Sequence, residues 1–106
     1  MLLRILTMRV DPAKVEAWMR FTRDTGFPGM LAQPGCRQIW RLRAHDVPPA
    51  GKTTADFQVM TLWDSQADLE HFRASDDMRR LIEAAAPFMA APGSEQLFDV
   101  IPDPAD

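Results

Sequence analysis

The stretch from Asp56 to Ser75, DFQVMTLWDSQADLEHFRAS, constrains the fold most, because it predicts a strand that runs directly into a helix. From Phe57 to Trp63 both alternating sets of side chains are largely apolar, which is typical of a central strand covered on both faces. Ser65, with Asp68 three residues later, resembles a capping box that starts a helix. The helix then shows an apolar stripe that begins with Leu69 and Phe72.

The chain opens with a second strand of the same two-sided kind, from about Leu2 to Val10. Arg4 and Arg9 interrupt it, and we expect both to reach solvent from its ends. Asp11-Pro12 is a typical helix start, with Asp as N-cap and Pro in the first turn. The helix carries a stripe of inward-facing positions and is expected to end at Gly26, Pro28 and Gly29; the stripe is Val15, Trp18, Met19 and Thr22.

A third strand, from Cys36 to Arg43, has the pattern of a sheet edge. One alternating set is suited to a core and the other is mostly arginine, which discourages pairing with another chain. The expected core side is Cys36, Trp40 and Leu42; the expected outer side is Arg37, Arg41 and Arg43, with Ile39 among them. Residues 44–55, AHDVPPAGKTTA, predict a mobile loop by composition.

The remaining segments predict a helix and a short strand. Ser75-Asp76 resembles an N-cap, and the helix that follows ends before Pro87. Its apolar stripe is Met78, Leu81, Ile82 and Ala85. Ala91-Pro92-Gly93 predicts a turn, Gln96 to Ile101 a last strand, and residues 102–106 a frayed tail.

The element order is therefore β-α-β-β-α-β, which predicts an α+β, ferredoxin-like domain over residues 1–106 with a four-stranded antiparallel sheet. This arrangement places the first and third strands in the centre, in agreement with their two apolar faces. Two helical layers cover only one face of such a sheet. We therefore expect the other face to be buried against a second copy, giving a homodimer that packs sheet against sheet.

Composition excludes several classes of partner. The net charge of −3 without a basic cluster argues against nucleic acid, and DFQVMTLW lacks the exposed aromatic and basic residues of an RNA-recognition strand. No apolar run approaches the ~20 residues that span a bilayer, and MLLRILTMRV does not resemble a signal peptide. A single cysteine, Cys36, excludes an internal disulfide and favours the cytoplasm.

The same segments resemble the antibiotic biosynthesis monooxygenase family of dimeric α/β-barrel proteins. The matching motifs are VDP before the first helix, PGCR at the second strand, and LWDSQADLEHFRAS between the third strand and the next helix. The resemblance runs from Leu3 to about Val100. It implies the ferredoxin-like fold and the dimer, and a choice among cofactor-independent oxygenases of phenols and quinols, haem-degrading enzymes and members without an assigned activity.

Departures from the family patterns narrow this choice. The places of the Trp and the iron-binding His of the haem-degrading branch hold Phe72 and Ile82, which do not ligate iron. The places of the Asn and Tyr of the phenol-oxidising branch hold Val59 and Leu69, while its Trp is kept as Trp63. Quinol-oxidising members carry a His where this chain has Phe72, and His71 is one position off, about 100° around a helix.

Five residues are expected to wall a substrate pocket between the sheet and the second helix: Trp63, Val59, Trp40, Leu69 and Phe72. The alternative is that they close into a solid core. No catalytic residue is assigned, and His71 is expected on the flank of its helix. His45-Asp46 and Cys36 lack the spacing of a metal site, and neither a haem ligand set nor a G-x-G-x-x-G loop occurs, so we expect no cofactor and no metal.

Two functions from different classes remain. One is a cofactor-independent monooxygenase for a small aromatic compound of the phenol or quinol type, whose own reactivity supports the chemistry. The other is a non-catalytic dimeric module that binds a small molecule or serves as an accessory. Both use the same fold, and fold alone does not decide between them.

Overall fold

The computed structural model describes residues 1–45 and 54–102, so most of the expected loop and the expected frayed tail lie outside the described residues. A four-stranded antiparallel sheet forms the base of the molecule, in the order β2-β3-β1-β4. Its strands are β1 (Leu2–Val10), β2 (Cys36–Leu42), β3 (Ala55–Trp63) and β4 (Met89–Asp99). The ferredoxin-like fold is confirmed, with the two strands that are apolar on both faces in the centre.

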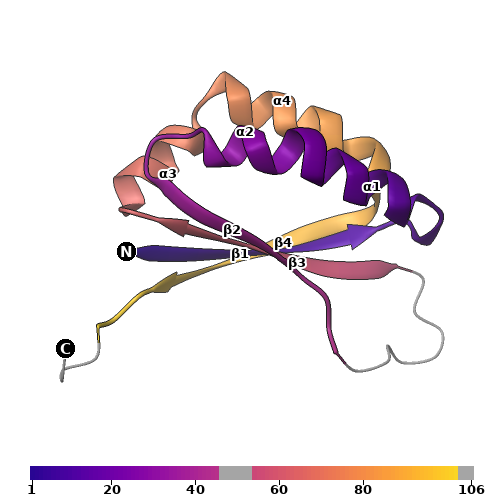
Figure 1. Cartoon of the computed structure of the whole chain (residues 1–106), viewed down its shortest axis with the longest axis horizontal. Helices are drawn as coiled ribbons and strands as arrows, with labels where there is room; N and C mark the ends of the chain where they lie inside the picture. Colours follow the sequence, from indigo (N-terminus) through magenta and orange to yellow (C-terminus); the bar gives the residue numbers. More distant parts are fainter. Residues whose placement is uncertain (46–53, 103–106) are drawn as a thin grey trace.

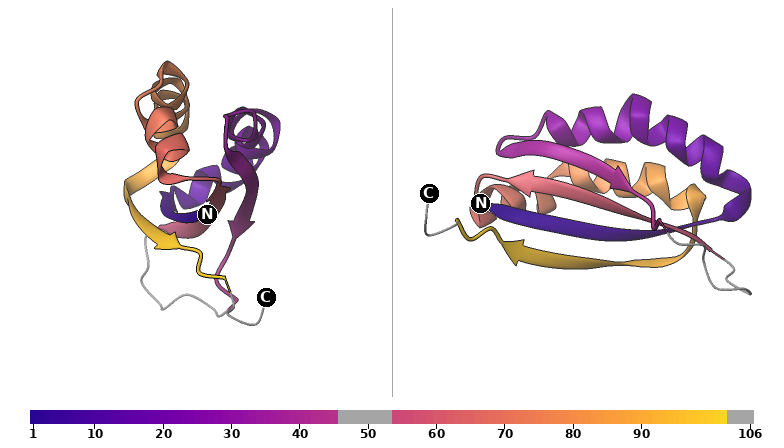
Figure 2. Two further views of the ribbon diagram at one scale, coloured as in Figure 1. Left: turned by 90° about the vertical axis from the view of Figure 1, so that its left-hand side faces the viewer. Right: turned by 60° about the horizontal axis from the view of Figure 1, so that its bottom comes forward.

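The helices all lie on one face of this sheet, and among the described residues nothing covers the other face (Figure 1). The first helical layer runs without a break from a 3-10 turn (Pro12–Lys14) through α1 (Val15–Phe21), a π-helical turn (Thr22–Gly26) and α2 (Phe27–Leu31). The second layer consists of α3 (Gln66–Arg73), α4 (Asp76–Ala85) and a 3-10 turn (Ala86–Phe88). Viewed from the end of the sheet, the two layers stand beside each other (Figure 2).

The helix starts are those that the sequence predicts. The Asp11 side chain accepts a hydrogen bond from the Ala13 N–H at 2.9 Å. Ser65 caps α3 and Ser75 caps α4, each accepting from the backbone N–H three residues on. Each cap satisfies one of the orphan donors at a helix N-terminus.

The first helix does not end at Gly26, Pro28 and Gly29, so that expectation is wrong. The Phe27 N–H bonds the Thr22 carbonyl, five residues back, which defines the π-turn. Pro28 then falls in the first turn of α2, where its missing N–H costs little. The wider turn lets the helix continue through a sequence that would otherwise stop it.

The last strand is longer than expected, because Ala91-Pro92-Gly93 lies within β4 and does not form a separate turn. The pairing of β4 with β1 shifts register on both sides of Arg9, so this part of the strand is bulged. A Cβ atom at Gly93 would lie 2.4 Å from the Thr7 carbonyl oxygen. The backbones approach so closely here that only glycine fits.

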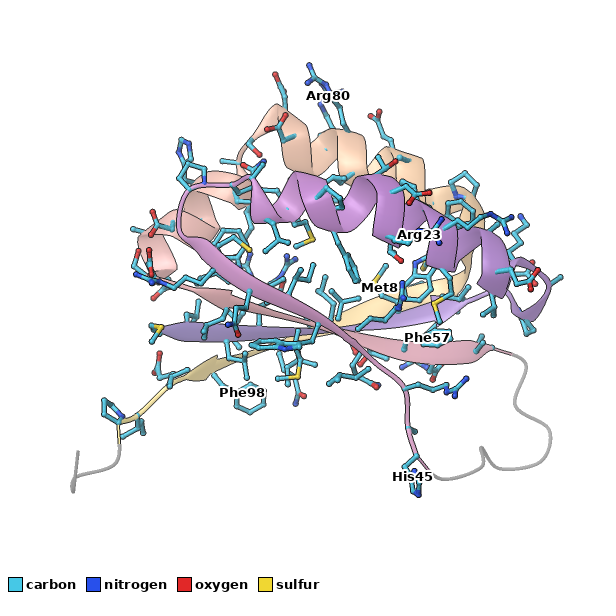
Figure 3. The ribbon with its side chains drawn as sticks, in the orientation of Figure 1. Met8, Arg23, His45, Phe57, Arg80 and Phe98 are labelled. Carbon is cyan, nitrogen blue, oxygen red and sulfur yellow. The ribbon has the colours of Figure 1, made fainter. Side chains whose placement is uncertain are left out.

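The core under the helices has two parts along the same sheet face. One contains Leu2, Met30, Trp63, Leu69 and Phe72, and the other contains Val10, Trp18, Phe57 and Val59. On the opposite face, Leu3 pairs with Leu62 and Ile5 with Met60 across the two central strands. Toward the edges of this open face lie Trp40, Leu42 and Phe98, which are exposed to between 39% and 45%. Figure 3 shows Phe98 on the side of the sheet away from the helices.

Candidate functional site

A cavity of about 120 Å³ lies between the two helical layers, above the central strands. Leu6, Met8 and Val59 are among its floor residues, and one wall comes from α1, the π-turn and α2. The other wall comes from Phe72 and from the apolar stripe of α4: Met78, Leu81, Ile82 and Ala85. Apart from Arg4 and Thr22, the lining consists of apolar side chains, aromatic rings and Gly26.

The two helical layers are joined at both ends of this space. At one end, Gln33 Nε2 donates to Asp77 Oδ2 at 3.0 Å. At the other, the rings of Phe21 and Phe88 stack with centroids 5.3 Å apart, and Lys14 Nζ donates to the Pro87 carbonyl at 2.7 Å. Between these contacts α4 buries none of its residues completely. Its apolar stripe lines the cavity. One member of the stripe, Ile82, remains 57% exposed.

Arg4 places a buried cation in the floor of the cavity. Its residue is only 4% exposed, and its Nε donates to Glu95 Oε2 at 2.6 Å. Glu95 also pairs with Arg73 on α3, and Arg73 Nη1 in turn bonds Glu70 at 3.0 Å. Burial lowers the pKa of the Arg4 guanidinium, and the bond to Glu95 opposes that shift. The expectation that Arg4 reaches solvent from the strand end is wrong, because position 4 faces the helices between Leu2 and Leu6.

The π-turn contributes Thr22 and Gly26 to the opposite wall. Both residues are buried, and the Thr22 hydroxyl donates to the Met19 carbonyl at 3.1 Å while it accepts from Arg41 Nη1 at 2.5 Å. Turns of this kind occur often at functional sites, because the extra residue redirects the side chains of one helix face.

Trp18 is completely buried in the same wall and has an unusual feature. Its ring stacks on Phe57 with centroids 4.8 Å apart, and the Arg41 guanidinium lies 5.8 Å from the ring centroid. Its Nε1 is nevertheless the one buried side-chain nitrogen or oxygen without a hydrogen-bond partner in the part of the chain that the structure describes. The ring is therefore held firmly in place, and its N–H group is enclosed by the packing around it.

The five expected pocket residues lie in different environments in the structure. Val59 and Phe72 line the cavity. Trp63 and Leu69 have no exposed surface and pack in the adjoining core, where Trp63 stacks on Phe72 at 5.4 Å and donates from Nε1 to Thr61 Oγ1 at 2.9 Å. The part that any of these residues plays in ligand binding stays a prediction.

Trp40 is not between the sheet and the helices, so its expected position is wrong. It pairs with Met60 on the open face and is 39% exposed. Ile39 and Arg41 face the helices in its place, because a bulge between Cys36 and Gln38 reverses the alternation of β2.

Sequence reasoning did not assign Arg4, Trp18 or Thr22 to the site. Trp18 and Thr22 are four residues apart on the stripe predicted for the first helix. The sequence therefore indicated that both side chains face inward, but not that they line the cavity. Arg4 had a signal as well, since it interrupts an apolar strand face at a position where the alternation calls for burial. Its partner Glu95 is 91 residues away, and no local pattern connects the two.

The other polar candidates lie away from the cavity. His71 is exposed on α3 and His45 is exposed beyond the end of β2. Cys36 is half-buried, and burial raises the pKa of its thiol. Arg37 pairs with Asp64 at the surface. Over residues 1–45 and 54–102, no group of three or more His, Cys, Asp or Glu side chains is placed to hold a metal ion.

The fold is shared with solved structures of bacterial proteins. Several are named "putative antibiotic biosynthesis monooxygenase", and three of these are described here. The protein from Nitrosomonas europaea is 19% identical, with a TM-score of 0.74 over 95% of this chain and 99% of that one. The protein from Caulobacter crescentus is 21% identical, with a TM-score of 0.75 over 95% and 90%. The protein from Deinococcus radiodurans is 11% identical, with a TM-score of 0.77 over 97% and 95%. At these identities the likeness shows the fold alone.

Comparison with proteins of curated function finds no match. Among the described residues, no helix is both long enough and apolar enough to pass through a bilayer. The sequence model of the antibiotic biosynthesis monooxygenase family matches residues 1–84. Since this match spans most of the 106 residues, the chain belongs to the antibiotic biosynthesis monooxygenase family.

Proposed function

We propose that the protein binds a small aromatic compound of the phenol or quinol type in the cavity between its helical layers and supports its monooxygenation without a cofactor. The observation that carries this proposal is the lining itself. It joins rings from Trp18, Phe21, Phe27 and Phe72 with methionine and aliphatic side chains, and Arg4 is its one ionisable member among the described residues. Such a surface suits a flat, weakly charged ligand.

The lining also limits the chemistry. With Arg4 as the sole ionisable group, it supplies a positive charge but no carboxylate, imidazole or thiolate to act as a base. The Arg4 guanidinium would stabilise a phenolate, whose proton passes to solvent. One atom of O₂ then bonds to a ring carbon and the other leaves as water. The phenol becomes a quinone, and its own electrons reduce the oxygen.

The alternative is a binding module that does not catalyse a reaction. It is favoured by the same shortage of ionisable groups, and by Val59 and Leu69 at the places where the phenol-oxidising pattern has Asn and Tyr. Under this alternative the cavity retains or delivers a ligand and leaves it unchanged.

Turnover and binding are separated by two measurements. In air-saturated buffer without added cofactor, 2-naphthol should be consumed together with O₂ when the protein is present. Ala85→Phe, which directs a ring into the cavity, should abolish both binding and oxygen uptake. Ala84→Phe is the matched control, because Ala84 lies one position away on the exposed face of α4. Binding without oxygen uptake would select the module, and the absence of both would refute the proposal.

We further propose that the protein is a homodimer that packs through the open face of the sheet. This proposal is supported by the pairs Leu3–Leu62 and Ile5–Met60 at the centre of that face and by Trp40 beside them. Exposed apolar surface of this kind is characteristic of an interface. The half-buried free thiol of Cys36 is consistent with a cytoplasmic location.

Light scattering at low micromolar concentration tests the dimer. The wild type should have twice the 12.0 kDa mass of one chain. Met60→Glu places a charge in the centre of the proposed interface and should give a monomer or prevent folding. Arg80→Glu, on the exposed face of α4 (Figure 3), should leave the dimer intact. A folded 12.0 kDa wild-type monomer under these conditions would contradict the proposal.

A further inference from the structure

The cavity is smaller than the aromatic ligands that the proposed function assigns to it. Its volume is about 120 Å³, whereas a cavity of about 150 Å³ holds benzene and pockets for larger organic ligands usually have about 300–1000 Å³. A bicyclic phenol such as 2-naphthol is larger than benzene, so the cavity encloses it only if a wall moves. Which wall moves depends on how firmly each is held.

Two sides of the cavity are held firmly. The floor belongs to the central strands β1 and β3, each of which pairs with a neighbour on both sides. The first helical layer buries Trp18, Thr22 and Met30, and Arg41 of β2 bonds the Thr22 hydroxyl at 2.5 Å. Displacement of either side would open the hydrophobic core.

The third side, α4, is held much less firmly. None of its residues is buried, and Ile82 is 57% exposed although it lines the cavity. Where Leu81 approaches the first layer it meets Gly29, which has no side chain; a Cβ atom there would lie 3.7 Å from Leu81 Cδ2. Elements with few buried apolar contacts are those that move at the lowest cost in free energy.

The two ends of α4 are attached to better packed parts of the molecule. Before the helix, the N–H and the hydroxyl of Ser75 donate to the Phe72 carbonyl at 3.0 Å and 2.6 Å, and Phe72 is itself buried. After the helix, the Phe88 carbonyl accepts from the Asp11 N–H at 2.8 Å. These attachments allow α4 to turn away from α2 while its connections to α3 and β4 stay in place.

A side-chain bond joins the N-terminal end of α4 to the first layer. Gln33 Nε2 donates to Asp77 Oδ2 at 3.0 Å and to the Gly29 carbonyl at 3.2 Å. Asp77 is exposed, so water replaces Gln33 as its partner when this bond opens, and the net cost in free energy is small.

We infer that α4 is a movable wall of the cavity, and that a ligand enters when the Gln33–Asp77 bond opens and α4 turns away from α2. The inference rests on the proposed function for its ligand, whereas the movement itself requires none. A ring inside the cavity gives the apolar stripe of α4 a surface to pack against. Closure on the ligand is therefore favoured by the burial of Ile82 and its neighbours.

The accessibility of the opposite wall measures this movement without a ligand. Met30 lines the cavity from α2 and is 9% exposed. Met30→Cys, combined with Cys36→Ser to remove the natural thiol, provides a group that iodoacetamide reaches when α4 turns away. Addition of Asp77→Ala should speed the modification about 3- to 10-fold, as the loss of one hydrogen bond provides.

Asp76→Ala is the matched control. Asp76 and Asp77 are exposed neighbours in the first turn of α4, and each pairs with an arginine three residues later, at 3.5 Å and 3.6 Å. Each variant removes one carboxylate and one surface ion pair, but Asp77→Ala also removes the bond to Gln33. Asp76→Ala should therefore leave the rate of modification within about 2-fold of its starting value.

Exchange of 2-naphthol gives a second readout that needs no introduced thiol. In anaerobic buffer, stopped-flow fluorescence follows binding and release without turnover. Asp77→Ala should raise the association and dissociation rate constants by the same factor, about 3- to 10-fold, and leave Kd nearly unchanged. The reason is that the bond to Gln33 is present in the closed state both with and without ligand. A variant that merely damaged the site would raise the dissociation rate constant alone.

The outcomes separate the inference from the proposed function. Equal rates of modification in Asp77→Ala and Asp76→Ala, with binding of 2-naphthol that Ala85→Phe still blocks, would overturn the movement of α4 and leave the cavity as a binding site. No binding of 2-naphthol by the wild type would overturn the proposed function and, with it, the entry of a ligand past α4. Faster modification and faster exchange in Asp77→Ala, and not in Asp76→Ala, would support the inference.

Discussion

Replacement of Trp63 by alanine tests whether this residue is core or pocket wall. In the structure Trp63 has no exposed surface. Its ring stacks on Phe72 with centroids 5.4 Å apart, and its Nε1 bonds Thr61 Oγ1 at 2.9 Å. Removing a buried aromatic ring costs about 3–5 kcal/mol, and about 1 kcal/mol of this corresponds to the lost hydrogen bond. We therefore expect Trp63→Ala to lower the free energy of unfolding by about 3–5 kcal/mol.

Two further variants divide this loss into its parts. Trp63→Phe keeps a ring against Phe72 but loses the bond to Thr61, so we expect about 1–2 kcal/mol. His71→Ala, on the exposed face of α3, is the surface control and should stay within about 0.5 kcal/mol of wild type.

Urea unfolding followed by far-ultraviolet circular dichroism measures these differences without using tryptophan as the probe. All variants must be compared at one protein concentration, because the stability of a dimer depends on it. A loss below about 1 kcal/mol for Trp63→Ala, together with loss of ligand binding, would refute the assignment to the core and restore Trp63 as an open wall of the pocket.

Three shorter predictions concern other parts of the structure. Glu95→Gln removes the charge that compensates the buried Arg4 and should lower the free energy of unfolding by about 1–3 kcal/mol. Its control, Glu70→Gln, breaks an exposed pair and should lower the free energy of unfolding by at most about 0.5 kcal/mol. Equal losses in urea unfolding would contradict the role of the buried pair. Gly93→Ala directs a methyl group at the backbone of β1 and should cost about 1–3 kcal/mol, so an unchanged unfolding midpoint would argue against the close approach. Burial raises the pKa of the Cys36 thiol and keeps it protonated at a pH where a solvent-exposed thiol is partly ionised. Iodoacetamide at pH 8 should therefore modify Cys36 more slowly in the folded protein than in urea. Equal rates would contradict the half-buried position of this thiol.

The central strands and the helix starts were predictable from sequence, because both depend on local chemistry. β1 was predicted with its observed bounds, and two-sided apolar character placed β1 and β3 in the middle of the sheet. Ser65 and Ser75 cap their helices through bonds that span only three residues. The uncovered sheet face followed from the same topology, since two helical layers cannot reach both sides.

Three of the failed predictions occur where one inserted residue changes the phase of a pattern. The bulge between Cys36 and Gln38 turns Trp40 to the open face and Arg41 toward the helices. The π-turn carries the first helix past Pro28, and the bulged pairing keeps Pro92 within β4. A single sequence shows the alternation, but the contacts that select an extra residue are made by other strands and helices.

The candidate site was decided by tertiary structure, because its polar groups depend on distant partners. Arg4 faces the helices from its place in β1, and its buried charge is compensated by Glu95, 91 residues later in the chain. The cavity exists because contacts such as Gln33–Asp77 and Phe21–Phe88 hold the helical layers together at their ends and leave a space between them. The sequence by itself determined that Trp18 faces the inside of the helix layer. Whether its indole N–H would be paired there depended on the side chains that the fold brought around it.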